Sequence, residues 1–585
     1  MRDVTILYTA LAVGAFGAGC QQNDDPGGNN QVGPVASVRV TPNPLQVHVG
    51  DSAGLTAVAL DSRGTPVPGT TTTWSSIDPA VATVSSSGVV LGKALGNSTI
   101  QALVQSISGS AAVSVVPQPT GGPTIGMATY LGGTATEMIR DLAVDPQGNL
   151  VMTGSTHSDD FPTTPGVLGP TLGCCSAKAY DAFVVKMSPA GSVLWSTFLG
   201  GPNYERGYAI ETDAQGFIFV AGRGGAGLPS TAGTFQPNFG GGNTGAAYGA
   251  QDGFICKITP DGKSIVWCSY FGTGDNGILR DIAVDDVGDV YVGGGFTGTG
   301  FPSSWFTNSY QKTPSQLQDL VVAKIKGDGS QVIWATYLGG SGREHESVSV
   351  RVDGQHNVYV LSTTESPDMP LANAADGSLN GPSDLYLAKL SPNGSTLLYG
   401  TYVGGSGGDV TETHGLWLDA QGNAFIGAQT TSSDLPTSAL AFQKQYGGGP
   451  SDAAVWKFSP SGALLAATYL GGTGGDGIEG ITLGPNGDVY ISGFMVSPNP
   501  PSPVLGTPGA GADVFAARLS PDLSTLRFSL KHGGSGSDNG RGVIVDGQVR
   551  LFVGGQTDSP NFPTLNAIQP TMRGTGDALL MRIDP

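Results

Sequence analysis

Seven positions of this chain carry side chains that could together bind a charged ligand. Each lies five residues before the Asp of a recurring phrase of the type Ala-Val-Asp, or before Gly484 in the repeat that lacks this Asp. Guanidinium groups bind carboxylates through paired hydrogen bonds, so a ring of such residues could hold a small anion, a glycan or the acidic end of a peptide. The alternative is that they only solvate the mouth of a closed ring of strands. The residues are Arg140, Tyr208, Arg280, Val348, His414, Glu479 and Arg541, and all except Val348 are candidate ligand-binding residues.

Candidates for catalysis are few. Within the ring, Glu479 and His414 are the residues that could supply a general acid and a general base. None of the six His lies in a His-x-x-x-His or Gly-x-Ser-x-Gly context, and no calcium-binding loop of the Asp-x-Asp-x-Asp-Gly type occurs. Two other groups of His and acidic residues fall in predicted loops, where solvation is the ordinary explanation: His157 with Asp159 and Asp160, and His345 with Glu344 and Glu346. We therefore assign no catalytic residue, no metal ligand and no cofactor.

A second pattern, an Asp followed five positions later by a base, also occurs seven times. Positions five apart on a strand lie on opposite faces, so the two residues cannot form an acid/base dyad within one strand. We expect a structural role instead, in which the Asp caps the preceding loop and the base bonds to a neighbour. The pairs are Asp181/Lys186, Asp252/Lys257, Asp319/Lys324, Asp384/Lys389, Asp452/Lys457, Asp513/Arg518 and Asp577/Arg582.

Each repeat has the pattern of four antiparallel strands. In the first complete repeat, "RDLAVDPQGN" is a strand and tight turn, "LVMTGST" a second strand, residues 157–180 a long loop, "DAFVVKMSPAGS" a third strand and turn, and "VLWSTFLGG" a fourth. Seven such repeats without a helical period predict an all-β, seven-bladed β-propeller. The long loops then share one face of the ring, the loop face, and the tight turns share the other, the turn face. Because binding residues usually lie on loops held by a rigid scaffold, we expect the site on the loop face.

The order of strands along the chain predicts how the ring closes. The phrase "GMATYLGG" at Gly126 has the pattern of an outermost strand but has no third strand before it, whereas the chain ends in a third strand, "DALLMRIDP". We therefore predict that Met127 to Leu131 pairs with Leu579 to Ile583 and completes the last blade. This closure would leave no exposed strand edge between the first and last blades.

Residues 35–117 alternate apolar and polar residues in short runs, which predicts a β-sandwich of roughly seven strands. The phrases "VGDSAGLTAVALDSRG", "TWSSIDPAVATVSSSGVVLG" and "GNSTIQA" resemble the bacterial Ig-like domain, group 2. The resemblance implies a spacer or adhesive stalk unit. We expect Trp74 at the centre of its core.

The repeats from Ile125 to Pro585 resemble the SBBP family of β-propeller repeats through "YLGG", "LAVDPQGN" and "DAFVVKMSPAGSVLW". A second resemblance, to the propeller of quinone-dependent dehydrogenases, rests on "TPDGKSIVW". The long loop between the second and third strands and the missing Trp in the last four blades argue against it.

The first 20 residues have the layout of an export signal, with one Arg, an apolar run and the small residues Gly17, Ala18 and Gly19 before Cys20. This end resembles a bacterial lipobox, which implies that Cys20 carries lipid and holds the protein at the outer membrane or cell surface. The alternative is a plain secretory signal. Export permits disulfides, and Cys256 and Cys268 would face each other across a hairpin that turns at Asp261. Cys174 and Cys175 could pair with each other or stay free.

Composition limits the partners. Charged residues are 12% of the chain, the formal net charge is −19, and no run of Lys or Arg occurs, so we expect no nucleic-acid partner. We expect a monomer that binds an unknown protein or glycan through the loop face, without catalysis. The alternative is a propeller enzyme, a glycan hydrolase or lyase, acting on an extracellular polymer at the channel mouth. The expected segments are a signal peptide (1–20), a disordered polar tether (21–34), the sandwich (35–117), a linker (118–124) and the propeller (125–585).

Overall fold

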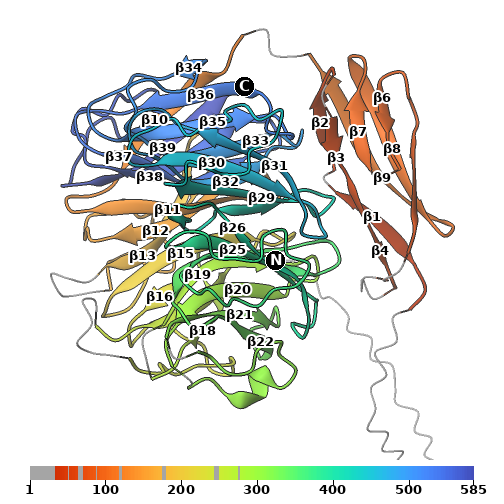
Figure 1. The fold of residues 1–585 in the computed structure, drawn as a ribbon. Coiled ribbons are helices and arrows are strands. Elements are labelled where there is room, and N and C mark those ends of the chain that lie inside the picture. Colours follow the sequence, from red (N-terminus) through yellow and green to blue (C-terminus); the bar gives the residue numbers. More distant parts are fainter. Residues whose placement is uncertain are drawn as a thin grey trace, which may run out of the picture.

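The computed structural model describes residues 33–585 except 42, 51, 63–66, 68–69, 87, 118–120, 174–179, 243–248, 275–276, 299 and 316. Within these residues the chain is all-β, with 39 strands and one short 3-10 helix, η1 (Ser303–Phe306). Figure 1 shows the N-terminal sandwich, in red and orange, lying beside the propeller. The predicted lipidation residue Cys20, the tether up to residue 32, Cys174 and Cys175 lie outside the described residues.

The sandwich consists of nine short strands around one apolar core, where about seven were expected. Trp74 is half-buried and packs against the rim of this core, not at its centre as expected. The reason is that its strand, β5, lies at the edge of a sheet, and the indole ring covers Gly88, where an added Cβ would lie 3.0 Å from it. The sheets are β1 (Ser37–Thr41) with β4 (Thr56–Leu60); β2 (Leu45–His48), β9 (Ile107–Val116), β8 (Gly96–Val104) and β5 (Thr72–Ser76); and β3 (Ser52–Gly54), β7 (Val89–Gly92) and β6 (Ala82–Val84).

The rest of the chain forms seven blades, each with four main strands ordered from the axis outward, which confirms the predicted propeller. Innermost strands of successive blades contact one another around the ring, so they line an axial channel. Blade 1 consists of β11 (Glu137–Val144), β12 (Leu150–Thr156), β13 (Asp181–Met187) and β14 (Val193–Leu199). Blade 2 consists of β15 (Glu205–Thr212), β16 (Ile218–Gly224), β17 (Asp252–Ile258) and β18 (Ile265–Phe271). Blade 3 consists of β19 (Gly277–Val284), β20 (Val290–Phe296), β21 (Asp319–Ile325) and β22 (Val332–Leu338).

The later blades vary more. Blade 5 has a broken innermost strand, β27 and β28, and blade 6 has an added short strand, β34 (Val504–Leu505), beside its outermost one. Blades 4 to 7 are β23 (Glu344–Val352), β24 (Val358–Thr364), β25 (Asp384–Leu390) and β26 (Leu397–Val403); β27 (Asp409–Val410), β28 (Leu416–Leu418), β29 (Ala424–Thr430), β30 (Asp452–Phe458) and β31 (Leu464–Leu470); β32 (Asp476–Leu483), β33 (Val489–Met495), β35 (Asp513–Leu519) and β36 (Leu526–His532); β37 (Asp538–Val545), β38 (Leu551–Thr557), β39 (Asp577–Asp584) and β10 (Thr124–Leu131).

Blade 7 closes the ring through the predicted pair of strands, but Met127 to Leu131 pair with Ala578 to Arg582, one residue away from the predicted register, because a bulge lies between Ile125 and Met127. Strand β10 pairs antiparallel with β39, so that Met127 lies opposite Arg582 and Leu131 opposite Ala578. The Tyr130 hydroxyl strengthens the closure because it donates to the carbonyl of Ser559 (2.7 Å) and accepts from the N–H of Phe562 (2.8 Å). The N-terminal strand of the propeller is thus the outermost strand of its last blade.

The repeated Asp and base hold loops and turns in place. Asp181 accepts a hydrogen bond from the N–H of Gly173 in the preceding long loop (2.7 Å), and the other Asp residues of the pattern accept equivalent bonds. Lys186 lies 2.7 Å from Asp145 in the turn of its own blade and donates to the carbonyl of Pro260 in the next blade (3.1 Å). These contacts agree with the structural role expected for the pattern.

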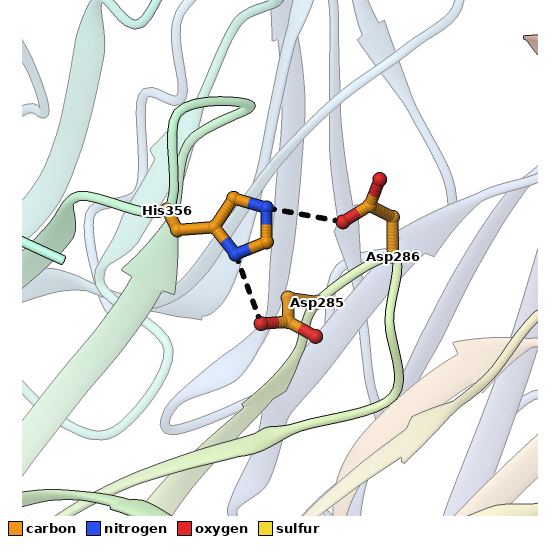
Figure 2. A group of neighbouring side chains, drawn as sticks. All are labelled: Asp285, Asp286 and His356. Atoms are coloured by element: carbon orange, nitrogen blue, oxygen red, sulfur yellow. Dashed lines mark hydrogen bonds and ion pairs between the residues drawn. The ribbon is translucent and has the colours of Figure 1, made fainter. Parts of the chain in front are cut away.

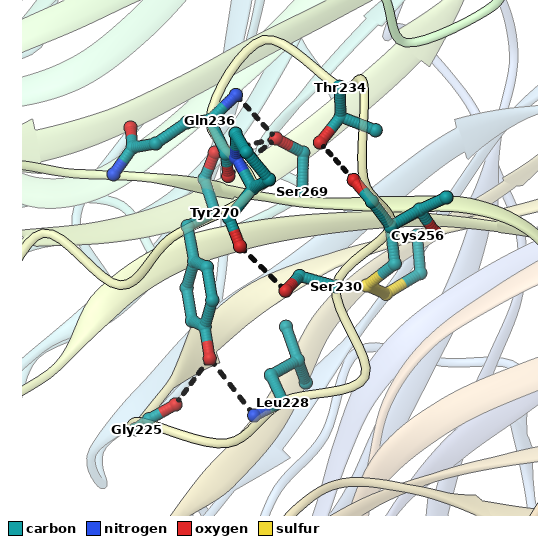
Figure 3. Close-up of a disulfide and its surroundings, with 11 residues drawn as sticks. Gly225, Leu228, Ser230, Thr234, Gln236, Cys256, Ser269 and Tyr270 are labelled. Carbon is teal, nitrogen blue, oxygen red and sulfur yellow. Dashed lines mark hydrogen bonds between the residues drawn. A yellow bond between two sulfur atoms is a disulfide. The ribbon is translucent and has the colours of Figure 1, made fainter.

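The predicted disulfide joins Cys256 of β17 to Cys268 of β18. The two residues lie directly opposite each other in the register, and both are fully buried. Figure 3 shows the loop that passes over this pair of strands, where the Tyr270 hydroxyl accepts the N–H of Leu228 (2.9 Å). The bridge therefore lies within blade 2, where it joins the third strand to the outermost one.

Candidate functional site at the mouth of the axial channel

β-Bulges place five of the six candidate binding residues. On β11, Ile139 pairs with Gly154 and Asp141 with Thr153, so the register passes over Arg140. The pairing of the innermost strand skips Tyr208, Arg280, Glu479 and Arg541 in the same way. A bulge removes its residue from the ladder and re-aims the side chain. Counting back five residues therefore located the bulge of each of these blades.

Blade 4 departs from the count. Val348 is fully buried and pairs with Ser362, because β23 carries its irregularity between Glu344 and Val348. Glu346, which lies within this irregular stretch, reaches the channel, and its Oε1 lies 2.6 Å from Nη2 of Arg280. Sequence reasoning had placed Glu346 in a solvated loop.

Guanidinium groups surround Tyr208. The guanidinium carbon of Arg280 lies 4.3 Å from the centroid of the Tyr208 ring, and that of Arg140 lies 5.3 Å from it. Arg223 and Arg206 lie 5.7 and 5.9 Å away. Burial alone would raise the pKa of Tyr208, but the four guanidinium groups lower it to about 8. The positive potential here therefore lets Tyr208 ionise at a lower pH than an ordinary tyrosine does.

Arg206 and Arg223 are site residues that sequence reasoning missed. They lie opposite each other on β15 and β16, where the bulge at Tyr208 shifts the register. Like charges in directly opposite positions destabilise a sheet, so two Arg residues in such positions are themselves a sign of a candidate site. The alternation of residues along the strands does not reveal this pairing, because it depends on the bulge at Tyr208. Arg223 also donates to the Tyr204 hydroxyl (3.1 Å).

Two ion pairs neutralise part of the ring. Besides Arg280 with Glu346, Arg541 pairs with Glu479, whose second oxygen accepts from Nδ2 of Asn539 (2.6 Å). Burial raises the pKa of Glu479, and Arg541 opposes this rise. These two carboxylates therefore neutralise Arg280 and Arg541 of the ring.

Arg140 has no carboxylate partner among the described residues. Its Nε is buried and makes no hydrogen bond there. Burial lowers the pKa of Arg140 to about 9, and the charges of Arg541, Arg206 and Arg280 act in the same direction. An anion placed beside this guanidinium would offset the cost of its burial and the repulsion from the neighbouring guanidinium groups.

His414 lies one layer deeper than the ring and spans the axis. Its backbone has φ +72°, within the segment that separates β27 from β28, so the side chain leaves blade 5. Its Nε2–H donates to the carbonyl of Tyr208 in blade 2 (3.1 Å), and its Nδ1 lies 3.4 Å from Asp281 in blade 3. Burial lowers the pKa of His414, but Asp141 and Asp281 raise it above its ordinary value. The buried imidazole thus forms a floor beneath the ring.

The structure does not bring Glu479 and His414 together as an acid/base pair. Glu479 faces Arg541 and Asn539, whereas both ring nitrogens of His414 face other blades. Beyond His414 a cavity of about 190 Å³ is lined by Asp141, Glu211, Arg351 and Trp417, among others, but not by Glu479. The floor separates this inner cavity from the mouth.

A cleft of about 530 Å³ lies on the turn face, between the sandwich and blades 5 to 7. Its wall includes Lys457, which donates to the carbonyl of Pro521 (3.1 Å) and forms no ion pair among the described residues. Ala53 and Val89 of the sandwich line the same cleft, so the sandwich covers part of the turn face. Lys457 is therefore a second place where an anion could bind.

A cluster of His356, Asp285 and Asp286 joins the turns of blades 3 and 4 (Figure 2). His356 Nδ1 lies 3.1 Å from Asp285 and Nε2 lies 3.2 Å from Asp286, while Lys324 lies 3.3 Å from Asp285. Hydrogen bonds to the two carboxylates raise the pKa of His356 to about 9. Because metal ligation requires a neutral imidazole, the cluster acts as an ion-pair network at neutral pH.

The chain resembles known proteins in both of its parts. Residues 34–115 match the family model of the bacterial Ig-like domain (group 2), and residues 128–162 match that of the SBBP beta-propeller repeat. The regulatory protein FlaEY of Caulobacter vibrioides is 25% identical over 325 residues, which are 52% of this chain and 31% of that protein. This chain therefore spans about a third of the length of that relative.

Solved structures are similar at low identity. A protein of unknown function from Dyadobacter fermentans is 11% identical with a TM-score of 0.36, over 79% of this chain and 99% of its own. Europium-containing methanol dehydrogenase is 10% identical with a TM-score of 0.34, over 94% and 93% of the two chains. No helix in the described part of the chain is long and apolar enough to cross a membrane.

Disulfides persist in oxidising compartments, and bacterial Ig-like domains are typical of exported proteins. The disulfide and the Ig-like match together indicate an extracytoplasmic protein, in which a segment that matches the bacterial Ig-like domain (group 2) is followed by a β-propeller whose residues 128–162 match the SBBP beta-propeller repeat.

Proposed function

We propose that the protein is a non-enzymatic binding protein whose propeller holds the anionic group of a ligand at the channel mouth on the loop face. The ligand is part of a protein or glycan outside the cell. The candidate binding residues are Arg140, Tyr208, Arg280 and Arg541, together with Arg206 and Arg223.

The observation that carries this proposal is the buried guanidinium of Arg140, which lacks a carboxylate partner among the described residues and lies beside three further guanidinium groups around Tyr208. Concentrating like charges is unfavourable unless an anion compensates them. The rest of the protein is acidic, with a net charge of −19, so this basic site contrasts with its surroundings. Such a site would direct an anion to the mouth.

The alternative, a glycan hydrolase or lyase, needs an acid and a base that face one substrate. Glu479 and His414 were the eligible pair, and they face different partners. The geometry therefore favours binding over catalysis.

We further propose that lipid on Cys20 anchors the protein at the outer membrane or cell surface, with the Ig-like domain as a spacer. Mass spectrometry of the membrane fraction tests this directly. A diacylated N-terminal Cys20 supports the anchor, and an unmodified Cys20 or cleavage at another site contradicts it.

Calorimetric titration of the secreted chain with a carboxylate probe, N-acetylglycine, tests the binding site. Arg140→Gln should weaken binding about tenfold, the usual size of one lost charged contact. Lys263→Gln, on an exposed turn, is the matched control that removes one cation, and Lys457→Gln tests the turn-face cleft as the rival site. If Lys457→Gln weakens binding and Arg140→Gln does not, the anion site is the turn-face cleft and the proposal is wrong.

A further inference from the structure

The first glycine of several Gly-Gly phrases lies between two carboxylates that belong to successive blades. At the seam of blades 3 and 4, the boundary where β21 and β23 begin, a Cβ added to Gly339 would clash with Oδ1 of Asp319 and would lie 2.8 Å from Oε2 of Glu344. Glycine is needed here because the carboxylates occupy the space of a side chain. The same arrangement recurs at other seams, where Asp577 and Glu137 flank Gly132, Asp384 and Asp409 flank Gly404, and Asp513 and Asp538 flank Gly533.

The pair at the seam of blades 3 and 4 is incompletely compensated. Asp319 and Glu344 are both fully buried. Ser315 donates to Asp319, while Thr364 (3.1 Å) and Ser366 donate to Oε1 of Glu344. Oε2 of Glu344 is buried and receives no hydrogen bond, although it borders Asp319. Neither carboxylate forms an ion pair with a described residue.

The other titratable side chains around this pair do not supply a positive charge. Those that act on it from β22, β25 and β26 are phenols, and burial raises the pKa of each one: Tyr337, Tyr386 and Tyr402. Beside Glu344 in the sequence, Arg343 is exposed, and His345 lies 3.0 Å from the half-exposed Glu365. These two cations therefore lie outside the buried seam.

Two other seams show how the chain compensates such a pair. At the seam of blades 7 and 1, Oε2 of Glu137, the equivalent of Oε2 of Glu344, accepts the N–H of Gly133 (3.0 Å). At the seam of blades 6 and 7, Lys531 stands where the outermost strands of blades 3, 4 and 5 have Tyr, and its Nζ lies 3.5 Å from Asp513. Glu344 has neither kind of partner among the described residues, so two ionised carboxylates would face each other there without compensation.

We infer that Asp319 and Glu344 share one proton, which makes the seam of blades 3 and 4 a proton-dependent contact that weakens when the proton is lost. Two carboxylates in one site cannot both ionise without a large cost, and one proton converts the two facing acceptors into a hydrogen bond. The contact is independent of the anion site at the channel mouth.

The electrostatics of the seam fix the pH range of this effect. Burial raises the pKa of Glu344 to about 7, Asp319 acts in the same direction, and the hydroxyl of Ser366 opposes the rise. The ordinary value is 4.5, so the pKa is higher in the folded than in the unfolded chain. The contribution to stability is therefore complete below about pH 4.5 and is lost as pH rises through 7.

The test is thermal unfolding of the full chain and of Glu344→Gln at pH 5.5 and pH 8. The Gln side chain has the shape of a protonated Glu, can donate to Asp319 and carries no charge at either pH. Relative to the parent, the melting temperature of the variant should rise by about 3 °C from pH 5.5 to pH 8. Glu365→Gln, at an exposed position, is the matched control and should change by less than about 1 °C.

A difference between Glu344→Gln and the parent that is the same at both pH values would overturn the shared proton, because a substitution that only disturbs packing acts at every pH. Two facing carboxylates could instead hold a divalent cation. If calcium chloride raises the melting temperature of the parent at pH 8 but not that of Glu344→Gln, the seam is a metal site and the inference is wrong. If Glu344→Gln does not fold, Asp319→Asn removes the partner charge and has the same expected result.

Discussion

Nε2 of His414 lies 3.1 Å from the carbonyl oxygen of Tyr208, although the two residues belong to blades 5 and 2 on opposite sides of the axis. This contact is formed because blade 5 breaks its innermost strand and His414 adopts a left-handed backbone conformation. Tyr208, which the guanidinium groups surround, is thus hydrogen-bonded directly to His414, which forms the floor beneath them.

Removing this link should destabilise the propeller. His414→Asn keeps a residue that tolerates the left-handed conformation but leaves buried Asp141 without its cation and Asp281 with Arg351 alone, so we expect a loss of about 2 to 3 kcal/mol in the free energy of unfolding. Urea denaturation measures it. His345→Asn, which removes only a half-exposed pair with Glu365, should change stability by less than about 0.5 kcal/mol. Equal stability of His414→Asn and the parent would show that the floor is not held by these contacts.

Anion binding should weaken as pH rises through about 8. The pKa of Tyr208 is about 8, so the phenolate that forms above this pH adds negative charge beside the anion. We expect the affinity for N-acetylglycine, whose own charge is constant in this range, to fall about tenfold between pH 7 and pH 9. The fall between pH 7 and pH 8.5 should be smaller in Tyr208→Phe. Identical pH profiles for the two proteins would contradict this role of Tyr208.

The cluster at His356 should give a pH-dependent contribution to stability. The pKa of His356 is about 9 in the folded protein, above its unfolded value, so its contribution is complete below about pH 6.5 and is lost as pH rises through 9. His356→Asn, which suits the φ of +64°, should cost about 1 kcal/mol at pH 6 and little at pH 10. Thermal melts at the two pH values measure this. A cost that does not change with pH would mean that packing, not charge, holds the two turns together.

Strand β10 should be essential to the ring, whereas the sandwich should not be. A chain that begins at residue 121 keeps the strand that pairs with β39, and a chain that begins at residue 134 lacks it. We expect the first to show the melting transition of the intact propeller. The second should be digested far faster by a protease, because blade 7 then exposes an unpaired edge. Equal protease resistance of the two chains would contradict the closure.

The sequence predicted most of this architecture because each repeat must bury the same faces. The spacing of the acid–base pattern and the shifted outermost strand were sufficient to predict seven blades and their closure. The count that located Arg140, Tyr208, Arg280, Glu479 and Arg541 worked because the bulge recurs at one place on the innermost strand.

The exceptions have local causes that pattern alone does not reveal. Glu346 replaces Val348 in the channel because β23 contains extra residues before the regular pairing resumes. His414 lies deeper in the channel than the count predicted, because blade 5 breaks its innermost strand there. Arg206 reaches Tyr208 from a position outside the count.

The location of a bound carboxylate tests the central claim most directly. A crystal structure of the protein soaked with 3-bromopropionate would reveal the ligand by the anomalous signal of bromine. The account predicts the carboxylate within hydrogen-bonding distance of the Arg140 guanidinium, beside Tyr208. A carboxylate bound beside Lys457 in the turn-face cleft, with the channel mouth empty, would contradict it.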